Sequence, residues 1–210
     1  MSMTKIQLNL AGWLSIILAI TYIPILIITI FMTVQGIEHG IEQATGRATE
    51  QTTEKNPYAL LNLILGLVCL GLFVYIMIQL KILLNSRFQF HNVDIIILIL
   101  IVLFIVSTIP LLLLLGSSET NMVANILSLV VVILHGIFEI IFARKILHLS
   151  DNLFGLLKPF SYTAMAGGIC MVTVILSPLA IIIGIVNYVI LGMIFFEAAE
   201  RLSPIEDNNV

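Results

Sequence analysis

Charged residues are scarce in this chain. They make up 10% of its 210 residues, whereas a soluble domain carries roughly 25%. The nine basic residues are outnumbered by twelve acidic ones, so the chain lacks the positive charge of a nucleic-acid binder. The two cysteines, Cys69 and Cys170, both fall in apolar stretches and suggest no disulfide. These shortages exclude an ordinary soluble domain and a basic nucleic-acid-binding domain.

Apolar residues are abundant instead. They occupy 60% of the 210 residues, about 126 positions, and the mean hydropathy is +1.16. A helix needs ~20 apolar residues to cross a bilayer, so this total is enough for about six spans with little left over. The composition therefore predicts an all-α, polytopic membrane helix bundle, with residues 1–210 forming a single integral membrane domain.

Six apolar stretches predict six transmembrane helices. They cover residues 10–34, 58–84, 95–115, 121–143, 162–176 and 179–199. The last two belong to one apolar run which, as a single helix, would be about 57 Å long. That is nearly twice the ~30 Å of the hydrocarbon core, and Ser177-Pro178 interrupts the run. A tight helical hairpin is predicted there, and a bundle of five spans is the alternative.

Basic residues predict the orientation. With six spans and the amino terminus inside, only Arg47 and Lys55 of the nine basic residues lie outside, as the positive-inside rule favours. The inner residues are Lys5, Lys81, Arg87, Arg144, Lys145, Lys158 and Arg201. Five spans would move Arg201 outside. We therefore expect both termini inside a multi-pass membrane protein of the bacterial inner (plasma) membrane, with an organellar or other membrane left open.

The segments outside the spans are short. Residues 35–56 are predicted to form an outer polar loop, and residues 204–210 a flexible tail. Residues 147–160 mix leucine and phenylalanine with polar side chains, which suits a short segment lying on the inner interface. Glu197 and Arg201 are four residues apart and are expected to form an ion pair.

One face of the fourth span is polar. Six of its residues are spaced alternately four and three apart, so they fall within about 80° of the helix circumference. They are Asn121, Asn125, Ser128, Val132, His135 and Glu139. Polar groups at membrane depth usually face the bundle interior. The stripe Asn125, Ser128, His135 and Glu139 is therefore the candidate lining of a pathway.

Two readings of His135 and Glu139 stay open. One turn apart, the two side chains can touch and form a proton-accepting pair, or two metal ligands, on the wall of a cavity. Alternatively they form an interhelical clamp, or Glu139 reaches toward Arg144 or Lys145 at the inner end. The second reading is the more common arrangement in membrane helices.

Other polar residues are candidates for helix–helix contacts. Asn62 in the second span and Asn187 and Tyr188 in the sixth lie on faces that also carry small residues. Hydrogen bonding between helices is the favoured reading for these three positions, ahead of substrate binding.

Catalytic patterns are missing. The zinc-protease motif H-E-x-x-H does not occur, because His135 and Glu139 have the wrong order and spacing. We assign no catalytic residue, no metal and no cofactor, and we lean against an enzyme.

Three function classes follow. The leading expectation is a protein with an interaction, assembly or membrane-organising role. The alternative is a proton-coupled, ion or small-solute carrier or channel that uses the stripe of the fourth span, and a lipid-facing enzyme ranks third. Expected partners are the lipid bilayer and either a second copy of the chain or another membrane protein, with no nucleic acid.

Overall fold

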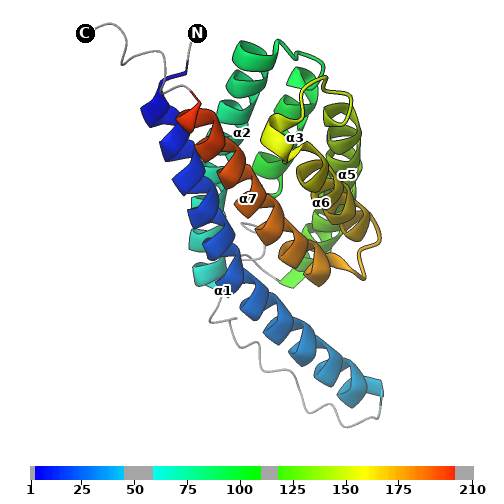
Figure 1. Ribbon diagram of the computed structural model, residues 1–210. Helices are drawn as coiled ribbons and strands as arrows, with labels where there is room; N and C mark the ends of the chain where they lie inside the picture. Colours follow the sequence, from blue (N-terminus) through cyan, green and yellow to red (C-terminus); the bar gives the residue numbers. More distant parts are fainter. Residues whose placement is uncertain (1–2, 45–58, 110–117, 202–210) are drawn as a thin grey trace, which may run out of the picture.

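Helices make up nearly all of the described structure. The computed structural model describes residues 3–44, 59–109 and 118–201, and within these ranges the chain forms six α-helices and one short 3₁₀-helix. The helices are α1 (Lys5–Ala44), α2 (Ala59–Phe88), α3 (Asp94–Val106), α5 (Ser118–Ile146), α6 (Leu157–Val172) and α7 (Ser177–Glu200), and the 3₁₀-helix is η1 (Leu153–Gly155). The predicted all-α bundle is confirmed (Figure 1).

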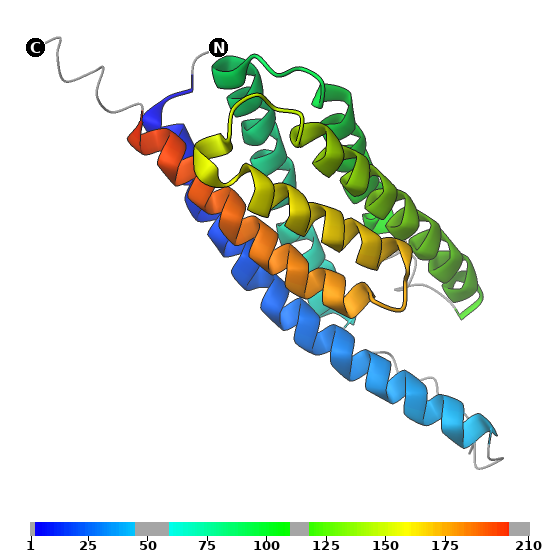
Figure 2. The same ribbon diagram turned by 45° about the vertical axis from the view of Figure 1, so that its right-hand side comes forward.

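The six α-helices close into a ring. Each helix contacts its neighbours along the chain, and α7 returns to pack against α1. Figure 2 shows α7 lying along α1 on one side and along α6 on the other. A ring of helices buries one side of each member and leaves the other side to the surroundings, which suits a chain whose helices are apolar nearly all round.

Four helices contain segments that are long and apolar enough to cross a membrane. The segments are Lys5–Ile28, Leu63–Phe88, Ala124–Ile146 and Pro178–Glu200, of 24, 26, 23 and 23 residues. The apolar helix α3 is shorter, with 13 residues, and α6 has 16. The chain is thus a helical bundle of the multi-pass membrane class, while six crossings and their orientation stay predictions.

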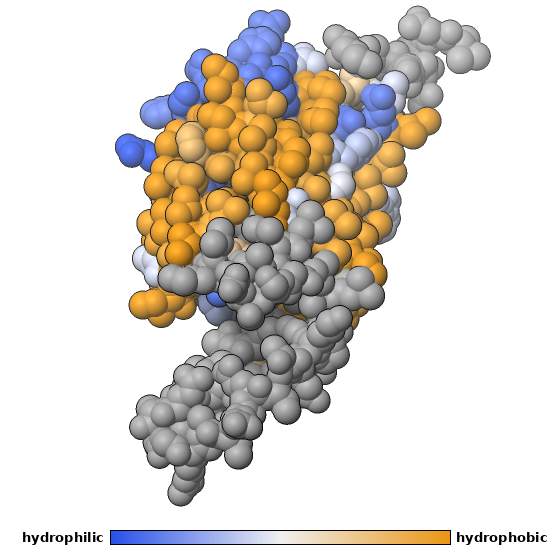
Figure 3. Space-filling view, turned by 180° about the vertical axis from the view of Figure 1, so that it is seen from behind, coloured by the Kyte–Doolittle hydropathy of each residue, from blue (hydrophilic) through white to orange (hydrophobic). Residues whose placement is uncertain are grey.

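The outer surface of the bundle is apolar. Ile6, Trp13 and Ile95 are 80%, 62% and 73% exposed. Figure 3 shows hydrophobic residues over the body of the molecule and hydrophilic residues gathered at one end. Exposure of such a large apolar surface to water is unfavourable in free energy. The hydrocarbon core of a bilayer solvates the same surface without this cost.

Helix α1 is longer than the sequence predicts. The outer polar loop was expected to begin at residue 35, but the helix continues to Ala44. Polarity alone does not end a helix, and the sequence from 35 to 44 contains glutamate, glutamine and alanine, which favour helix, and no proline. The rest of the expected loop, residues 45–56, lies outside the described residues, as does the tail 204–210.

The predicted hairpin is present, with its turn placed earlier. Helix α6 ends at Val172, residues 173–176 form the turn, and α7 begins at Ser177. Pro178 therefore lies in the first turn of α7, where its missing N–H costs no helical hydrogen bond. The third span was predicted over residues 95–115. Helix α3 covers its first part and ends at Val106, and the predicted residues from 110 onward lie outside the described residues.

The segment predicted to lie on the inner interface is largely part of the bundle. Its apolar residues Leu149, Leu153 and Phe160 are buried in the core cluster, so protein rather than lipid covers them. The ring of Phe154 lies between two guanidinium groups, 5.1 Å from Arg87 and 4.7 Å from Arg201. These cation–π contacts join η1, which contains Phe154, to the ends of α2 and α7.

The ion pair expected at the end of α7 is present. Arg201 Nη2 lies 3.0 Å from Glu197 Oε1. Both side chains are partly exposed, so the pair contributes at most about 1 kcal/mol.

Glycines allow two pairs of helices to approach through their backbones. A Cβ added to Gly136 of α5 would lie 2.7 Å from the carbonyl oxygen of Gly168 of α6, and the reverse distance is also 2.7 Å. At the α1–α7 contact, a Cβ on Gly192 would lie 3.1 Å from the oxygen of Gly12. Small residues at such crossings are a common means of joining membrane helices.

We expect Gly168→Ala to destabilise the bundle by about 1–3 kcal/mol, because the new methyl group would overlap a backbone oxygen that cannot rotate away. Chemical unfolding of the detergent-purified protein measures the change. Gly71→Ala is the matched control, since nothing lies within 4 Å of the added Cβ there. Equal unfolding midpoints for Gly168→Ala and Gly71→Ala would mean that the crossing tolerates a side chain.

Candidate binding cavity

A cavity of about 300 Å³ lies inside the ring of helices. All six helices contribute side chains to its wall, either from within the helix or, for Ser107, from the residue that caps it. The lining residues are Tyr22, Phe73, Met77, Leu100, Phe104, Ser107, Val131, Val132, His135, Glu139, Phe142, Phe160, Ala164, Met171, Ala180, Ile181, Gly184, Asn187, Tyr188 and Leu191. The volume is at the lower end of the range for ligand pockets, roughly 300–1,000 Å³.

The wall is mainly apolar and aromatic. Six phenylalanine and tyrosine rings line it, and four of them form two stacked pairs. Tyr22 and Tyr188 have ring centroids 5.5 Å apart at 17°, while Phe73 and Phe104 are 4.3 Å apart at 20°. The few polar groups therefore stand out against a background that offers almost no hydrogen bonds.

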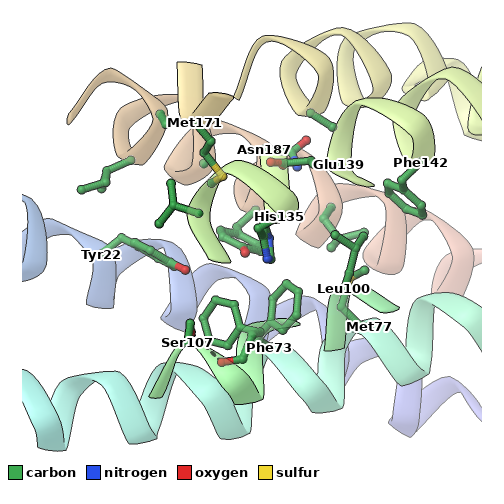
Figure 4. A pocket seen from close by; sticks show the side chains of 18 of the residues that line it. Tyr22, Phe73, Met77, Leu100, Ser107, His135, Glu139, Phe142, Met171 and Asn187 are labelled. Atoms are coloured by element: carbon green, nitrogen blue, oxygen red, sulfur yellow. Dashed lines mark hydrogen bonds between the residues drawn. The ribbon is translucent and has the colours of Figure 1, made fainter. Parts of the chain in front are cut away.

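Glu139 points toward α6 at a position where that helix has no side chain. A Cβ added to Gly167 would lie 3.6 Å from Glu139 Oε1 and 3.8 Å from Oε2, which is ordinary van der Waals contact, so the carboxyl group lies close to this glycine. Oε2 is buried and has no hydrogen-bond partner. Figure 4 shows Glu139 and Asn187 on the same side of the cavity, opposite Phe73 and Ser107.

His135 faces a different part of the cavity from Glu139. Its ring lies 6.2 Å from the ring of Phe73 and 6.0 Å from that of Phe104. Within the described residues, no hydrogen bond or ion pair joins it to Glu139. The proton-accepting pair of His135 and Glu139 therefore stays a prediction. Positions four apart share a helix face, but here Glu139 lies near Gly167 of α6 and the His135 ring lies near the aromatic rings of α2 and α3.

The polar stripe of the fourth span is divided. Val132, His135 and Glu139 line the cavity, whereas Asn125 and Ser128 are exposed and are not among its lining residues. That the whole stripe forms one pathway stays a prediction. Helix α6 has 16 residues against 29 in α5, so it does not cover the first turns of α5, as Figure 2 shows.

The other predicted polar residues have structural contacts. Asn187, expected to bond another helix, has its Oδ1 2.8 Å from the hydroxyl oxygen of Thr163 in α6, which donates the hydrogen bond. Tyr188 stacks on Tyr22 of α1. Both Asn187 and Tyr188 also line the cavity. Asn62 belongs to α2, but its side chain lies outside the described residues.

Several members of the site were not foreseen from the sequence. Tyr22, Phe73, Phe104 and Gly167 carry no pattern that separates them from ordinary helix-packing residues. A tyrosine in the middle of an apolar stretch was a usable signal for Tyr22, because its hydroxyl needs a polar neighbour at membrane depth.

The chemistry of the site is that of a single carboxyl group in an apolar cavity. No lysine or arginine is among the described lining residues. Arg144 and Lys145, the expected partners of Glu139, are exposed at the end of α5, and Lys145 Nζ instead donates to the carbonyl oxygen of Asn92. No group of three histidine, cysteine, aspartate or glutamate residues that could hold a metal ion occurs in the described part of the chain. Glu139 can thus take a proton or act as counter-ion to a cation.

Comparisons with protein-family models, with curated proteins and with solved structures gave no match. The function of the protein is therefore inferred from its fold and its cavity. They define a multi-helix membrane bundle with an ionisable group in the wall of its cavity.

We expect Glu139→Met to stabilise the protein by about 1–3 kcal/mol, because it removes a buried acceptor that has no hydrogen-bond partner. Unfolding in detergent measures the gain. In the control Glu197→Met, the lost ion pair with Arg201 is exposed and should cost no more than about 1 kcal/mol. A clear loss of stability in Glu139→Met would show that the carboxyl group is held by a partner and is structural.

Proposed function

We propose that this protein is a small membrane carrier that holds a proton or a small solute in its central cavity. One observation carries the proposal: Glu139, whose Oε2 is buried without a hydrogen-bond partner, lines a cavity to which all six described helices contribute. Ionisable groups inside membrane bundles are costly, and they usually mark a pathway or a binding site. A structural clamp between helices would bring a partner to the carboxyl group, whereas Glu139 Oε2 has none.

The geometry of the helices supports movement around the cavity. Helix α1 contains Pro24, α3 ends at Val106, and a turn at residues 173–176 separates α6 from α7. Discontinuous helices next to a central site are typical of membrane carriers. An interaction or assembly role, the leading expectation from composition, stays a prediction, and no contact in the bundle supports it specifically.

Proton flux in liposomes tests the carrier. We expect the protein to dissipate a pH gradient and Glu139→Gln to lower the rate on the order of tenfold or more, because an amide cannot take up and release a proton. Glu197→Gln, outside the cavity, should match the parent protein. Gly184→Leu should also lower the rate, since Gly184 lines the cavity and has space for a side chain. Gly71→Leu is its control.

Equal flux in the parent protein and Glu139→Gln, or no flux from any variant, would reject the carrier. The interaction class would then lead, and cross-linking in membranes would be the way to find a partner.

We further propose six crossings with both termini inside. The up-and-down ring supports this arrangement, since it brings the start of α1, the end of α2 and the end of α7 to one end of the molecule (Figure 1). The seven basic residues predicted to lie inside are all in segments that meet at this end. The apolar exterior makes the lipid bilayer the partner of the whole bundle.

Single cysteines test the orientation after Cys69 and Cys170 have been replaced. Ser86→Cys and Ser150→Cys are exposed positions at the basic end. Ile175 is 89% exposed in the turn between α6 and α7. In whole cells we expect a membrane-impermeant maleimide to label Ile175→Cys and to leave the other two unlabelled until the membrane is opened. Protection of Ile175→Cys on both sides would favour five spans.

A further inference from the structure

The carboxyl group of Glu139 limits what can occupy the cavity. Its Oε2 is buried without a hydrogen-bond partner, and no lysine or arginine is among the described lining residues. A carboxylate charge in such surroundings is tolerated only when a counter-charge accompanies it, and otherwise the group takes up a proton. A neutral or anionic solute therefore leaves Glu139 protonated, whereas a positively charged solute can pair with its carboxylate.

A metal cation is a poor match for these walls. Calcium and magnesium ions take six or more oxygen ligands in protein sites. Here Glu139 is the one described carboxylate that lines the cavity. The Asn187 side-chain oxygen already accepts a hydrogen bond from Thr163, and the Ser107 hydroxyl donates to the Phe104 carbonyl at 2.6 Å. The described wall therefore offers a single carboxylate beside the neutral polar side chains of Tyr22, His135 and Tyr188, which falls short of the oxygen-rich ligand set that these ions prefer.

Aromatic rings supply the remaining attraction. The stacked pair Tyr22 and Tyr188 comes from α1 and α7, and the stacked pair Phe73 and Phe104 comes from α2 and α3. All four rings line the cavity together with Glu139. The face of an aromatic ring attracts an ammonium group, and its apolar body accepts hydrocarbon. A cavity of about 300 Å³ also restricts the solute to a compact molecule.

We infer that the cavity binds a small organic cation, an ammonium group attached to an apolar or aromatic body, with Glu139 as its counter-ion and the aromatic rings around it. This inference rests on the proposed carrier function and names its solute class. The carboxylate of Glu139 neutralises the charge of the solute. The apolar body of the solute makes van der Waals contacts with the cavity wall, which the wall lacks when the cavity is empty.

Two probes of the same shape test the charge. Benzyltrimethylammonium and neopentylbenzene differ by the exchange of a cationic nitrogen for a carbon atom. A ligand that binds the folded state raises the unfolding midpoint, and at a fixed concentration the rise is larger for a tighter ligand and grows with the logarithm of its affinity. We expect the cation to raise the midpoint of the detergent-purified protein and to bind on the order of tenfold more tightly than its neutral counterpart.

Four variants test whether the probes bind in the cavity beside Glu139. Glu139→Gln should weaken binding of the cation by about the same factor and leave neopentylbenzene unchanged. Glu197→Gln should behave as the parent protein. Gly184→Leu fills the cavity and should abolish binding of both probes, whereas Gly71→Leu should not. Binding that survives Gly184→Leu would show that the probe associates elsewhere, for example with the micelle, and would overturn the inference.

The outcomes separate the solute class from the carrier itself. Equal affinity for the two probes would reject the organic cation while leaving a solute cavity. Absence of binding together with proton flux that depends on Glu139 would mean that the cavity serves protons alone, and the solute class would be wrong. Absence of both binding and flux would reject the proposed carrier as well.

Discussion

Helices α5 and α6 approach one another through their backbones, because Gly136 and Gly168 place no side chain between them. This crossing sets the rotation and height of α5, and with them the positions of His135 and Glu139. It also brings Gly167 close to the carboxyl group of Glu139. The close glycine crossing is thus the constraint that places a charged group at the edge of the cavity.

The ring of helices explains why a cavity exists at all. Six helices around a common centre leave more space than the side chains at their inner faces fill, and here small residues such as Ala164, Ala180 and Gly184 line part of that space. Aromatic rings fill the rest in stacked pairs. An apolar void without a polar group would be a packing defect, whereas this one contains a carboxyl group and is suited to a ligand.

Much of the fold could be predicted from the sequence, because burial of apolar residues is a matter of composition and spacing. The helical class, the breaks near Pro178 and the Glu197–Arg201 pair all follow from local rules. Helix ends were less predictable: α1 continues beyond its apolar stretch, since polar helix-forming residues extend it. For the site, the face that carries His135 and Glu139 was identified, but the sequence of α5 does not reveal that Asn125 and Ser128 lie beyond the lining of the cavity, because the length of the covering helix α6 is not encoded in α5.

The sequence by itself determined the solvent of this protein, the helical state of its backbone and the few positions where a polar group must be accommodated. These depend on residue type and on periodicity along one helix. Only the tertiary structure decided which side chains share the cavity. Glu139 meets Gly167 and the paired aromatic rings surround a common space because six helices from distant parts of the chain close into a ring, and the direction in which a side chain leaves its helix depends on the neighbour that gives it room.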